Sequence, residues 1–284
     1  MANLPAFPPP PNPLISLISG IKTKDLKSPL TRKWNPGFLS GIKTRLKVQE
    51  RIGGKRIREI QKGLTMPDIE RVAIGSAKTM VASIMFFDLP DFTRLTSNLG
   101  NKNTLFILNL IIPQVMFITK RWGGEIEKNT GDGIMAIFGT ETRNDFLIAR
   151  DTIEAALSIR YVILNEVNPR VTKKYLPILG FRIGIDMENV LIARVGMEGT
   201  NFLTVVGNAA NRASKLQSYA KPNGICLGEN IYSNLHPQLH SYCEPVSHPE
   251  WNWVYKGTDR PYRLFHFNAN WPEPMEWLRT KNLA

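Results

Sequence analysis

Short apolar runs separated by polar turns fill the chain after residue 80 and predict a mixed α/β fold. Residues 81–87 are apolar, β-branched or aromatic and lead into Asp88, a pattern typical of a buried strand that carries a carboxylate at its C-terminal end. Residues 124–128 and 134–138 predict two further strands, and the Asn-Thr-Gly-Asp-Gly sequence between them is rich in residues that tolerate turn conformations. We therefore expect a β-hairpin with Asp132 in its turn.

Helical periodicity and further strand-like runs alternate along the rest of this region. Helices are expected over residues 103–121, 143–167 and 207–219, and strands over residues 179–186, 190–195 and 202–206. The longest apolar stretch, residues 104–119, is shorter than a bilayer span and contains Asn109, Pro113 and Gln114. A buried helix therefore explains this stretch better than a membrane-spanning one.

The first 78 residues have a different composition. Residues 1–13 contain six prolines, which predicts an extended tail, and residues 46–63 have the pattern of an amphipathic helix weakened by two glycines. Residues 1–78 hold 15 Lys or Arg against 5 Asp or Glu, so they carry +10 of the formal charge of +12. We interpret residues 1–78 as a basic, Pro-rich N-terminal extension that packs on the body or on a partner subunit, and residues 79–284 as a separate folded domain. Nucleic-acid binding driven by this charge is the alternative; we expect no stable nucleic-acid or membrane partner.

The overall composition is that of a globular protein. With 43% hydrophobic and 21% charged residues, the 284-residue chain is expected to fold over most of its length, which excludes a wholly disordered or fibrous protein. Cys226 and Cys243 lack paired spacing partners, and the Pro-rich start does not resemble a secretory signal. We expect a cytoplasmic protein with reduced thiols.

Asp88 and Asp132 are the candidate metal ligands. Mg²⁺ prefers oxygen ligands, and one or two carboxylates together with substrate phosphates are enough to bind it. In a two-metal site, one ion activates the attacking oxygen and the other neutralises the leaving group. Considered singly, Asp88 is more typical of a helix cap and Asp132 of a simple turn former, so the argument depends on the pair and on its sequence context.

Four ordered motifs resemble those of class III nucleotidyl cyclases, and together they cover about residues 80–266. They are Phe-Phe-Asp-Leu-Pro-Asp-Phe-Thr at 86–93, Glu-Lys-Asn-Thr-Gly-Asp-Gly-Ile-Met-Ala-Ile-Phe-Gly at 127–139, Phe-Arg-Ile-Gly-Ile-Asp at 181–186 and Thr-Val-Val-Gly-Asn-Ala-Ala-Asn-Arg-Ala-Ser-Lys-Leu at 204–216. The resemblance implies an α/β (α+β) fold similar to the ferredoxin-like palm of polymerases. It also implies a phosphorus-oxygen lyase, which closes a nucleoside triphosphate into a 3′,5′-cyclic mononucleotide and releases pyrophosphate.

The resemblance also implies roles for individual positions. Asp88, Asp132 and the backbone carbonyl of Leu89 match the family's ligands for two divalent ions, Mg²⁺ or Mn²⁺, in each site. Catalytic domains of this family pair head to tail, so a homodimer with shared active sites is implied. The positions that the second subunit would supply are Lys128 and Thr204, which face the base, Asn211, which orients the ribose, and Lys215, which contacts the phosphate in the transition state.

Two departures from the family pattern bear on the phosphates. Asp91 replaces a glycine that is common in the first motif, and we expect this change to alter the loop that approaches the phosphates. Lys215 stands where the family usually has an arginine, so the charge is kept but the planar fork that grips two phosphate oxygens is lost. Both changes concern the rate and the phosphate geometry and leave the reaction class unchanged.

Hydrogen-bond chemistry leaves three bases open. Lys128 only donates, whereas the Thr204 hydroxyl donates or accepts, so the pair disfavours guanine and accommodates adenine, cytosine or uracil in a site walled by apolar neighbours such as Val206. In the family, Lys with Thr usually accompanies adenylate cyclase activity. Small freestanding cyclases of this sort resemble the pyrimidine cyclases of the bacterial Pycsar antiphage systems. We favour a uridylate or cytidylate cyclase that makes cUMP or cCMP for antiphage defence; the alternatives are an adenylate cyclase that makes cAMP and a catalytically inactive nucleotide-binding module.

Overall fold

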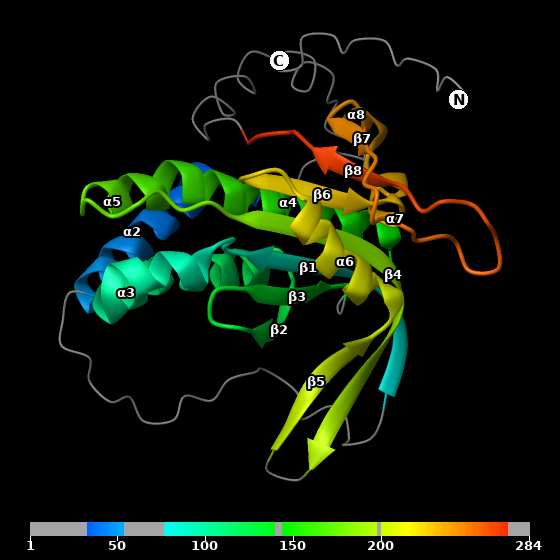
Figure 1. Ribbon diagram of the computed structural model, residues 1–284, viewed down its shortest axis with the longest axis horizontal. Coiled ribbons are helices and arrows are strands. Elements are labelled where there is room, and N and C mark those ends of the chain that lie inside the picture. Colours follow the sequence, from blue (N-terminus) through cyan, green and yellow to red (C-terminus); the bar gives the residue numbers. More distant parts are fainter. Residues whose placement is uncertain (1–32, 54–76, 140–143, 198–199, 272–284) are drawn as a thin grey trace.

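The computed structural model describes residues 33–53, 77–139, 144–197 and 200–271, which form one mixed sheet covered by helices (Figure 1). The helices are α2 (Pro36–Gly53), α3 (Phe92–Arg121), α4 (Asp145–Val162), α5 (Asn168–Thr172), α6 (Asn208–Tyr219), α7 (Glu229–Ser233) and α8 (Pro237–His240), and a π-helical turn (Ile163–Val167) joins α4 to α5. The strands are β1 (Ala77–Asp88), β2 (Glu125–Asn129), β3 (Ile134–Phe138), β4 (Arg182–Met197), β5 (Thr200–Val206), β6 (Gly224–Gly228), β7 (Cys243–Val246) and β8 (Leu264–Phe267). This arrangement confirms the α+β fold class expected from the sequence.

Strands β1 and β4 form the centre of the sheet. The strand order is β2-β3-β1-β4-β6-β8-β7, with β5 paired to β4 outside this path. β1 runs antiparallel to β4 over its whole length and ends with Asp88 opposite Arg182. The prediction of two separate strands over residues 179–186 and 190–195 is wrong, because pairing with β1 and β5 keeps the polar residues between these runs in one continuous strand.

Alternating residues of β1 contribute to two cores. Met85 and Phe87 pack with α3 and α4 in the larger core, whereas Ala82 and Ile84 pack with α6 on the opposite face of the sheet. Because both faces are covered, the strand is a continuous apolar run in the sequence. Asp88 follows this run and is only half-buried, so its carboxylate lies where the strand emerges from the core.

Helix α3 extends the predicted helix back to Phe92, with a kink at Gly100, whose φ of 71° lies in the left-handed region. Within the described part of the chain, Arg94–Arg121 is the single helical segment that is long and apolar enough to cross a membrane by length and composition. Its side chains Ile107 and Leu110 are fully buried in the larger core. The apolar character of the helix is therefore explained by packing inside the protein, as the sequence indicated.

Helix α2 packs against α3 at the N-terminal end of the described chain (Figure 1). The Asn35 side chain accepts a hydrogen bond from the amide of Phe38 at 2.9 Å, and Pro36 occupies the first helical position, so the helix begins there. Phe38 and Ile42 are buried in the larger core. This part of the N-terminal extension therefore packs on the body, and the helix predicted over residues 46–63 begins earlier, at Pro36. The Pro-rich tail and residues 54–63 lie outside the described part of the chain.

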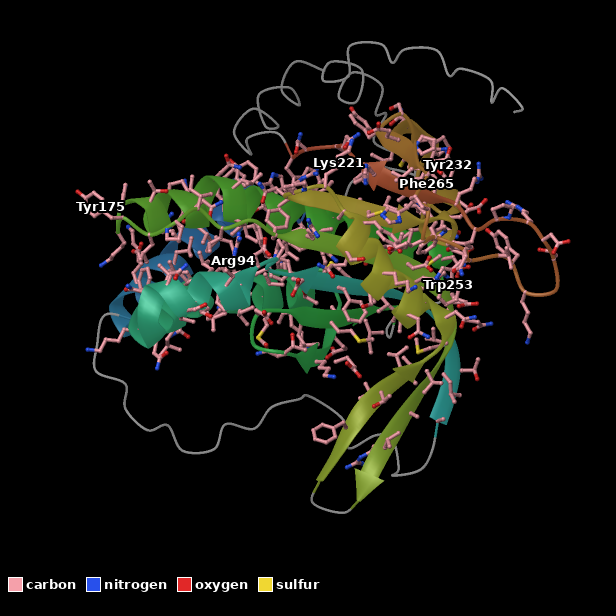
Figure 2. The ribbon with its side chains drawn as sticks, viewed as in Figure 1. Arg94, Tyr175, Lys221, Tyr232, Trp253 and Phe265 are labelled. Carbon is pink, nitrogen blue, oxygen red and sulfur yellow. The ribbon has the colours of Figure 1, made fainter. Side chains whose placement is uncertain are left out.

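Several further elements follow the predicted pattern closely, whereas β6, α7, α8, β7 and β8 were not predicted from the sequence. The hairpin of β2 and β3 and the helix α6 lie where the sequence places them. Helix α4 begins after Asn144, whose side chain accepts a hydrogen bond from the amide of Leu147 at 3.1 Å. Near the C-terminal strands of the sheet, Tyr232 of α7 stacks on Phe265 of β8 with ring centroids 4.1 Å apart (Figure 2). Both cysteines are free, in agreement with the expected reduced thiols.

Candidate active site

Asp88 and Asp132 lie next to each other at the end of the sheet where β1 terminates. In the antiparallel pairing of β1 with β3, Phe87 is opposite Ile134, so the hairpin turn that holds Asp132 meets the C-terminal end of β1. Burial raises the pKa of the Asp88 carboxyl, and the negative charge of Asp132 raises it further. The structure thus brings together the two carboxylates that the sequence singled out.

The hairpin turn keeps the space in front of Asp88 free. Gly131 has a φ of 102°, and its amide donates to the Asn129 side-chain oxygen at 2.9 Å, while the amide of Thr130 donates to the carbonyl of Gly133 at 3.0 Å. A Cβ atom on Gly133 would lie 3.2 Å from Oδ1 of Asp88. A glycine at this position therefore prevents a side chain from crowding the carboxylate.

The oxygen atoms at this end of the sheet fit a hard divalent cation. Asp88 and Asp132 offer carboxylate oxygens, and the Leu89 carbonyl, which accepts one hydrogen bond from the Phe92 amide at 3.3 Å, has a second lone pair. Within the described ranges, no group of three or more His, Cys, Asp or Glu side chains could hold a metal ion. Two carboxylates suit an ion whose other ligands are waters and substrate phosphates.

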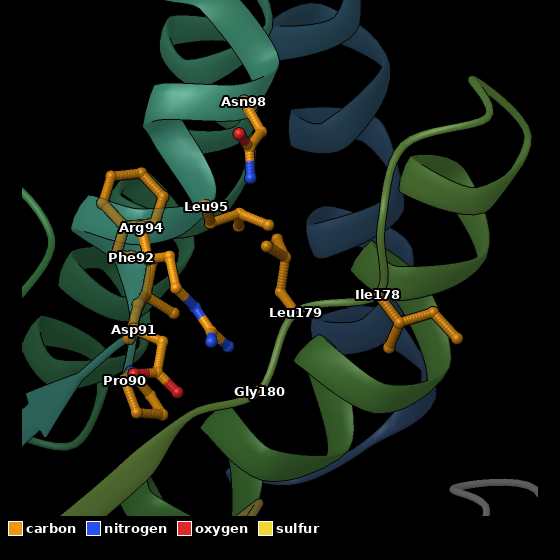
Figure 3. A pocket seen from close by; sticks show the side chains of 10 residues that line it. Pro90, Asp91, Phe92, Arg94, Leu95, Asn98, Ile178, Leu179 and Gly180 are labelled. Atoms are coloured by element: carbon orange, nitrogen blue, oxygen red, sulfur yellow. The ribbon is translucent and has the colours of Figure 1, made fainter.

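The loop after β1 contains Asp91, which stands where the family commonly has a glycine. Asp91 has φ 58° and ψ 15°, the left-handed conformation that favours glycine. It borders a cavity of about 400 Å³ together with Arg94, Asn98 and the segment Ile178–Gly180. Figure 3 shows the Asp91 carboxylate and the Arg94 guanidinium on one wall of this cavity, both directed toward Ile178–Gly180. The aspartate therefore adds a negative charge to the loop that carries the Leu89 carbonyl.

Two residues near Asp88 were not singled out from the sequence. Arg182, opposite Asp88 in the sheet, lowers the pKa of that carboxyl by its positive charge, and its Nε is buried without a hydrogen-bond partner in the described structure. Gln217 of α6 donates from Nε2 to Oδ2 of Asp88 at 3.2 Å. Arg182 belongs to the motif at residues 181–186, which could have indicated it as a site residue. No sequence pattern indicated which face of α6 meets β1.

The residues expected to face the base lie on two neighbouring strands. Lys128 is on β2 and Thr204 is on β5, and these strands contact each other. Lys128 is exposed and Thr204 is half-buried. Val206, which we expected to wall the site, is 54% exposed. Within one chain Lys128 and Val206 therefore face solvent, and Thr204 is partly covered.

Helix α6 presents Asn211 and Lys215 away from the metal aspartates of its own chain. Both are exposed, and with Ser214 they form a stripe at helical spacing. Successive helical residues turn by about 100°, so Lys215 lies about 200° around the axis from Gln217, which contacts Asp88. One chain alone thus does not bring Asn211 or Lys215 to its own carboxylate pair.

Paired carboxylates at the end of a central strand of an α+β sheet, with oxygen atoms that fit a divalent cation, are typical of enzymes that act on nucleotide phosphates. The family model of the adenylate and guanylate cyclase catalytic domain matches residues 75–250. The chain belongs to this family, the class III nucleotidyl cyclases, whose members use divalent metal ions.

Named relatives differ in the base they act on. A uridylate cyclase of Burkholderia cepacia is 29% identical over 187 residues, which cover 64% of this chain and 79% of that protein. An adenylate cyclase of Anabaena cylindrica is 28% identical over 169 residues, 59% of this chain but only 33% of that protein. Among solved structures, the guanylyl cyclase Cya2 superposes with a TM-score of 0.59 at 24% identity and covers 71% of this chain and 97% of its own. This likeness confirms the fold.

Proposed function

We propose that this protein converts a pyrimidine nucleoside triphosphate, UTP or CTP, into its 3′,5′-cyclic monophosphate. The proposal depends on the juxtaposition of Asp88 and Asp132 at the end of β1. In this reaction the 3′ oxygen of the substrate attacks its own α-phosphorus and pyrophosphate leaves, so no protein nucleophile is needed. Catalysis then consists of positioning and charge stabilisation, which exposed Lys and Asn side chains would provide when a second subunit brings them to the carboxylate pair.

Asp88, Asp132 and the Leu89 carbonyl would hold two divalent ions. When bound, these ions would neutralise negative charge on the triphosphate. Arg182 adds a fixed positive charge at the same end of the sheet. Its Nη1 donates to the carbonyl of Ser218 on α6 at 3.3 Å, so the guanidinium is held between the helix and β1. The described part of the chain thus places carboxylate and carbonyl oxygens close to an arginine.

We further propose a homodimer in which each active site takes Asp88 and Asp132 from one subunit and Lys128, Thr204, Asn211 and Lys215 from the other. The exposure of Lys128, Asn211 and Lys215 within one chain supports this division. A two-stranded ribbon of β5 and the outer half of β4 extends from the body (Figure 1) and exposes apolar side chains, namely Val195, Phe202 and Val206. A second copy of this chain is the occupant that would cover both features.

The choice of a pyrimidine is supported by the uridylate cyclase relative, most of whose length aligns with this chain. Lys128 and Thr204 can pair with uracil or cytosine, and they can also pair with adenine. An adenylate cyclase is therefore the second candidate, supported by the Anabaena relative. A catalytically inactive module is disfavoured because both aspartates and Asn211 are retained. The cytoplasmic location and the antiphage role stay predictions.

The test is incubation of the purified protein with ATP, GTP, CTP and UTP, each with Mn²⁺, followed by identification of products by mass. Cyclic UMP or CMP should dominate, and Asp88→Ala and Asp132→Ala should each abolish it. Glu125→Ala is the matched control, because Glu125 is a β2 carboxylate that pairs with Lys120 at the surface. Faster turnover of ATP than of either pyrimidine triphosphate would leave the adenylate assignment standing.

The shared site has its own test. Asp88→Ala and Asn211→Ala protein, each inactive alone, should regain part of the activity when mixed, because one of the two sites in the mixed dimer is intact. Verified heterodimers without activity would contradict the shared site.

A further inference from the structure

One face of β4 meets α6 through three alternate residues. Side chains on a strand alternate between faces, so Gly184, Asp186 and Glu188 point to the same side. At Gly184 the helix lies directly on the strand: a Cβ atom there would be 2.1 Å from the carbonyl oxygen of Ala213. A helix normally packs on apolar strand residues, and here two carboxylates occupy the next positions along the strand.

Asp186 is fully buried and carries a dense set of hydrogen bonds. Its Oδ2 accepts from Nε of Arg212 on α6, and its Oδ1 accepts from the hydroxyl of Tyr262 at 2.6 Å. The fit is tight, since a Cβ on Gly228 would lie 2.3 Å from Oδ1 of Asp186. The Arg212 guanidinium also packs over the Tyr262 ring, 4.4 Å from its centroid, and lies 5.7 Å from the centroid of the Trp253 ring.

Glu188 holds the first turn of α6. The residue before the helix is Gly207, which has no side chain to cap it. Instead Oε2 of Glu188 accepts from the Ala209 amide at 3.1 Å and from Nη2 of Arg212 at 3.0 Å. A carboxylate is favourable at a helix N-terminus because it meets free amides and the positive end of the helix dipole. Both β4 carboxylates thus converge on the turn that contains Asn211.

Buried ion pairs contribute little net stability, because desolvation offsets their attraction, but they fix geometry. We propose that Asp186 and Glu188 are positioning residues, which hold Arg212 and the first turn of α6 so that Asn211 and Lys215 reach the substrate at the partner subunit's metal site. This inference rests on the proposed shared site.

The kinetic signature follows from what α6 contributes. In the proposed site, substrate affinity comes mainly from the base contacts and from the metal-bound phosphates, neither of which α6 supplies. Displacement of Asn211 and Lys215 should therefore lower kcat by about 10- to 100-fold and change KM by less than about threefold. A loss of overall stability alone would lower the amount of active enzyme and leave kcat per folded site unchanged.

The single-variant test compares Asp186→Asn with Glu229→Gln. Glu229 is also a buried carboxylate, 1% exposed, and is bound by Arg263 at 2.7 Å, but it lies on α7 away from the active-site face of α6. Both variants should lose stability, and only Asp186→Asn should show the kcat loss per folded site. Glu188→Ala should resemble Asp186→Asn, and Glu188→Gln should restore much of kcat because its side-chain oxygen still accepts from Ala209.

A pair of heterodimers locates the effect. In the trans dimer, one subunit carries Asp88→Ala and the other Asp186→Asn, so the single site with intact metal ligands receives an unaltered α6. In the cis dimer, one subunit carries both changes and the other is wild type, so the intact metal ligands face the altered α6. The trans dimer should match an Asp88→Ala and wild-type heterodimer, and the cis dimer should be about 10- to 100-fold slower.

Each outcome decides the question. Equal rates in the trans and cis dimers, with restored activity in the Asp88→Ala and Asn211→Ala mixture, would overturn the positioning role alone. Failure of that mixture would overturn the shared site, and the positioning role with it. If Asp186→Asn does not fold, Glu188→Ala, whose side chain is one-third exposed, takes its place in both heterodimers.

Discussion

Gln217 joins helix α6 to the candidate metal site of its own chain, through a hydrogen bond of 3.2 Å from its Nε2 to Oδ2 of Asp88. Asn211 and Lys215 lie on the exposed face of the same helix. In the proposed dimer, each α6 therefore contacts one active site through Gln217 and serves the other through Asn211 and Lys215. A shift of the last turn of α6, which carries Gln217, would disturb the metal site of its own chain.

Removal of the hydrogen bond from Gln217 to Asp88 should weaken metal binding. Partners of a metal-binding carboxylate orient it, and their loss typically costs about 10- to 100-fold in metal affinity or activity. Gln217→Ala should therefore raise the Mn²⁺ concentration needed for half-maximal activity by about tenfold, measured by titration of Mn²⁺ at saturating substrate. Ser218→Ala is the matched control, since the Ser218 hydroxyl donates only to a carbonyl within α6. Equal Mn²⁺ dependence in the two variants would exclude an orienting role for Gln217.

Substitution of Lys128 should flatten the discrimination between substrates. Lys128 is exposed within one chain, so its contact with the base would be buried only in the proposed dimer with substrate bound. Loss of the donor there leaves the base acceptor unpaired, which costs roughly 1–3 kcal/mol, or about one to two orders of magnitude in rate when the contact persists in the transition state. Lys128→Ala should lower kcat/KM by about that factor for the natural triphosphate and hardly affect poorly matched ones. The check is kcat/KM for all four triphosphates in both proteins. A uniform loss across the four bases would assign Lys128 to the phosphates instead of the base.

Local sequence patterns were sufficient for the strand that ends in Asp88 and for the hairpin that holds Asp132, because short apolar runs and turn residues act over a few positions. The break expected in β4 shows the limit of such patterns. Glu188 interrupts an apolar strand pattern, and its carboxylate binds Arg212. Arg212 belongs to α6, which follows later in the chain, so no local pattern could reveal this contact. Gln217 is a similar case, since its partner is set by how the helix lies on the sheet.

The left-handed conformation of Asp91 permits a test that separates backbone strain from charge. Both Asp91→Gly and Asp91→Ala remove a negative charge beside the phosphate-approaching loop, so both should lower KM for the triphosphate. Only alanine should be strained at φ 58°, where left-handed geometry costs about 1–2 kcal/mol. Asp91→Ala should therefore unfold at lower urea concentration than Asp91→Gly, with equal KM values. Different KM values in the two variants would show that loop geometry governs phosphate binding.

Asp186 should impose a recognisable pH dependence on stability. Burial raises the pKa of its carboxyl to about 6, against the opposing effects of Arg212 and Tyr262. Between the pKa of the unfolded chain, about 4, and this folded value, the native state holds more protons, so rising pH lowers the free energy of unfolding. Relative to Asp186→Asn, the wild-type protein should lose about 2 kcal/mol between pH 4.5 and pH 7.5.

Urea titrations of the wild-type protein and of Asp186→Asn across this pH range measure the difference in their free energies of unfolding. Carboxyl groups common to the two proteins cancel to first order. The loss of a partner for Arg212 adds a nearly constant offset to the free energy of unfolding of Asp186→Asn. Parallel curves would mean that Asp186 ionises in the folded protein as easily as in the unfolded chain. The stabilising hydrogen bonds from Arg212 and Tyr262 would then balance the cost of burying the charge, and the ionised carboxylate would be neither favoured nor disfavoured by folding.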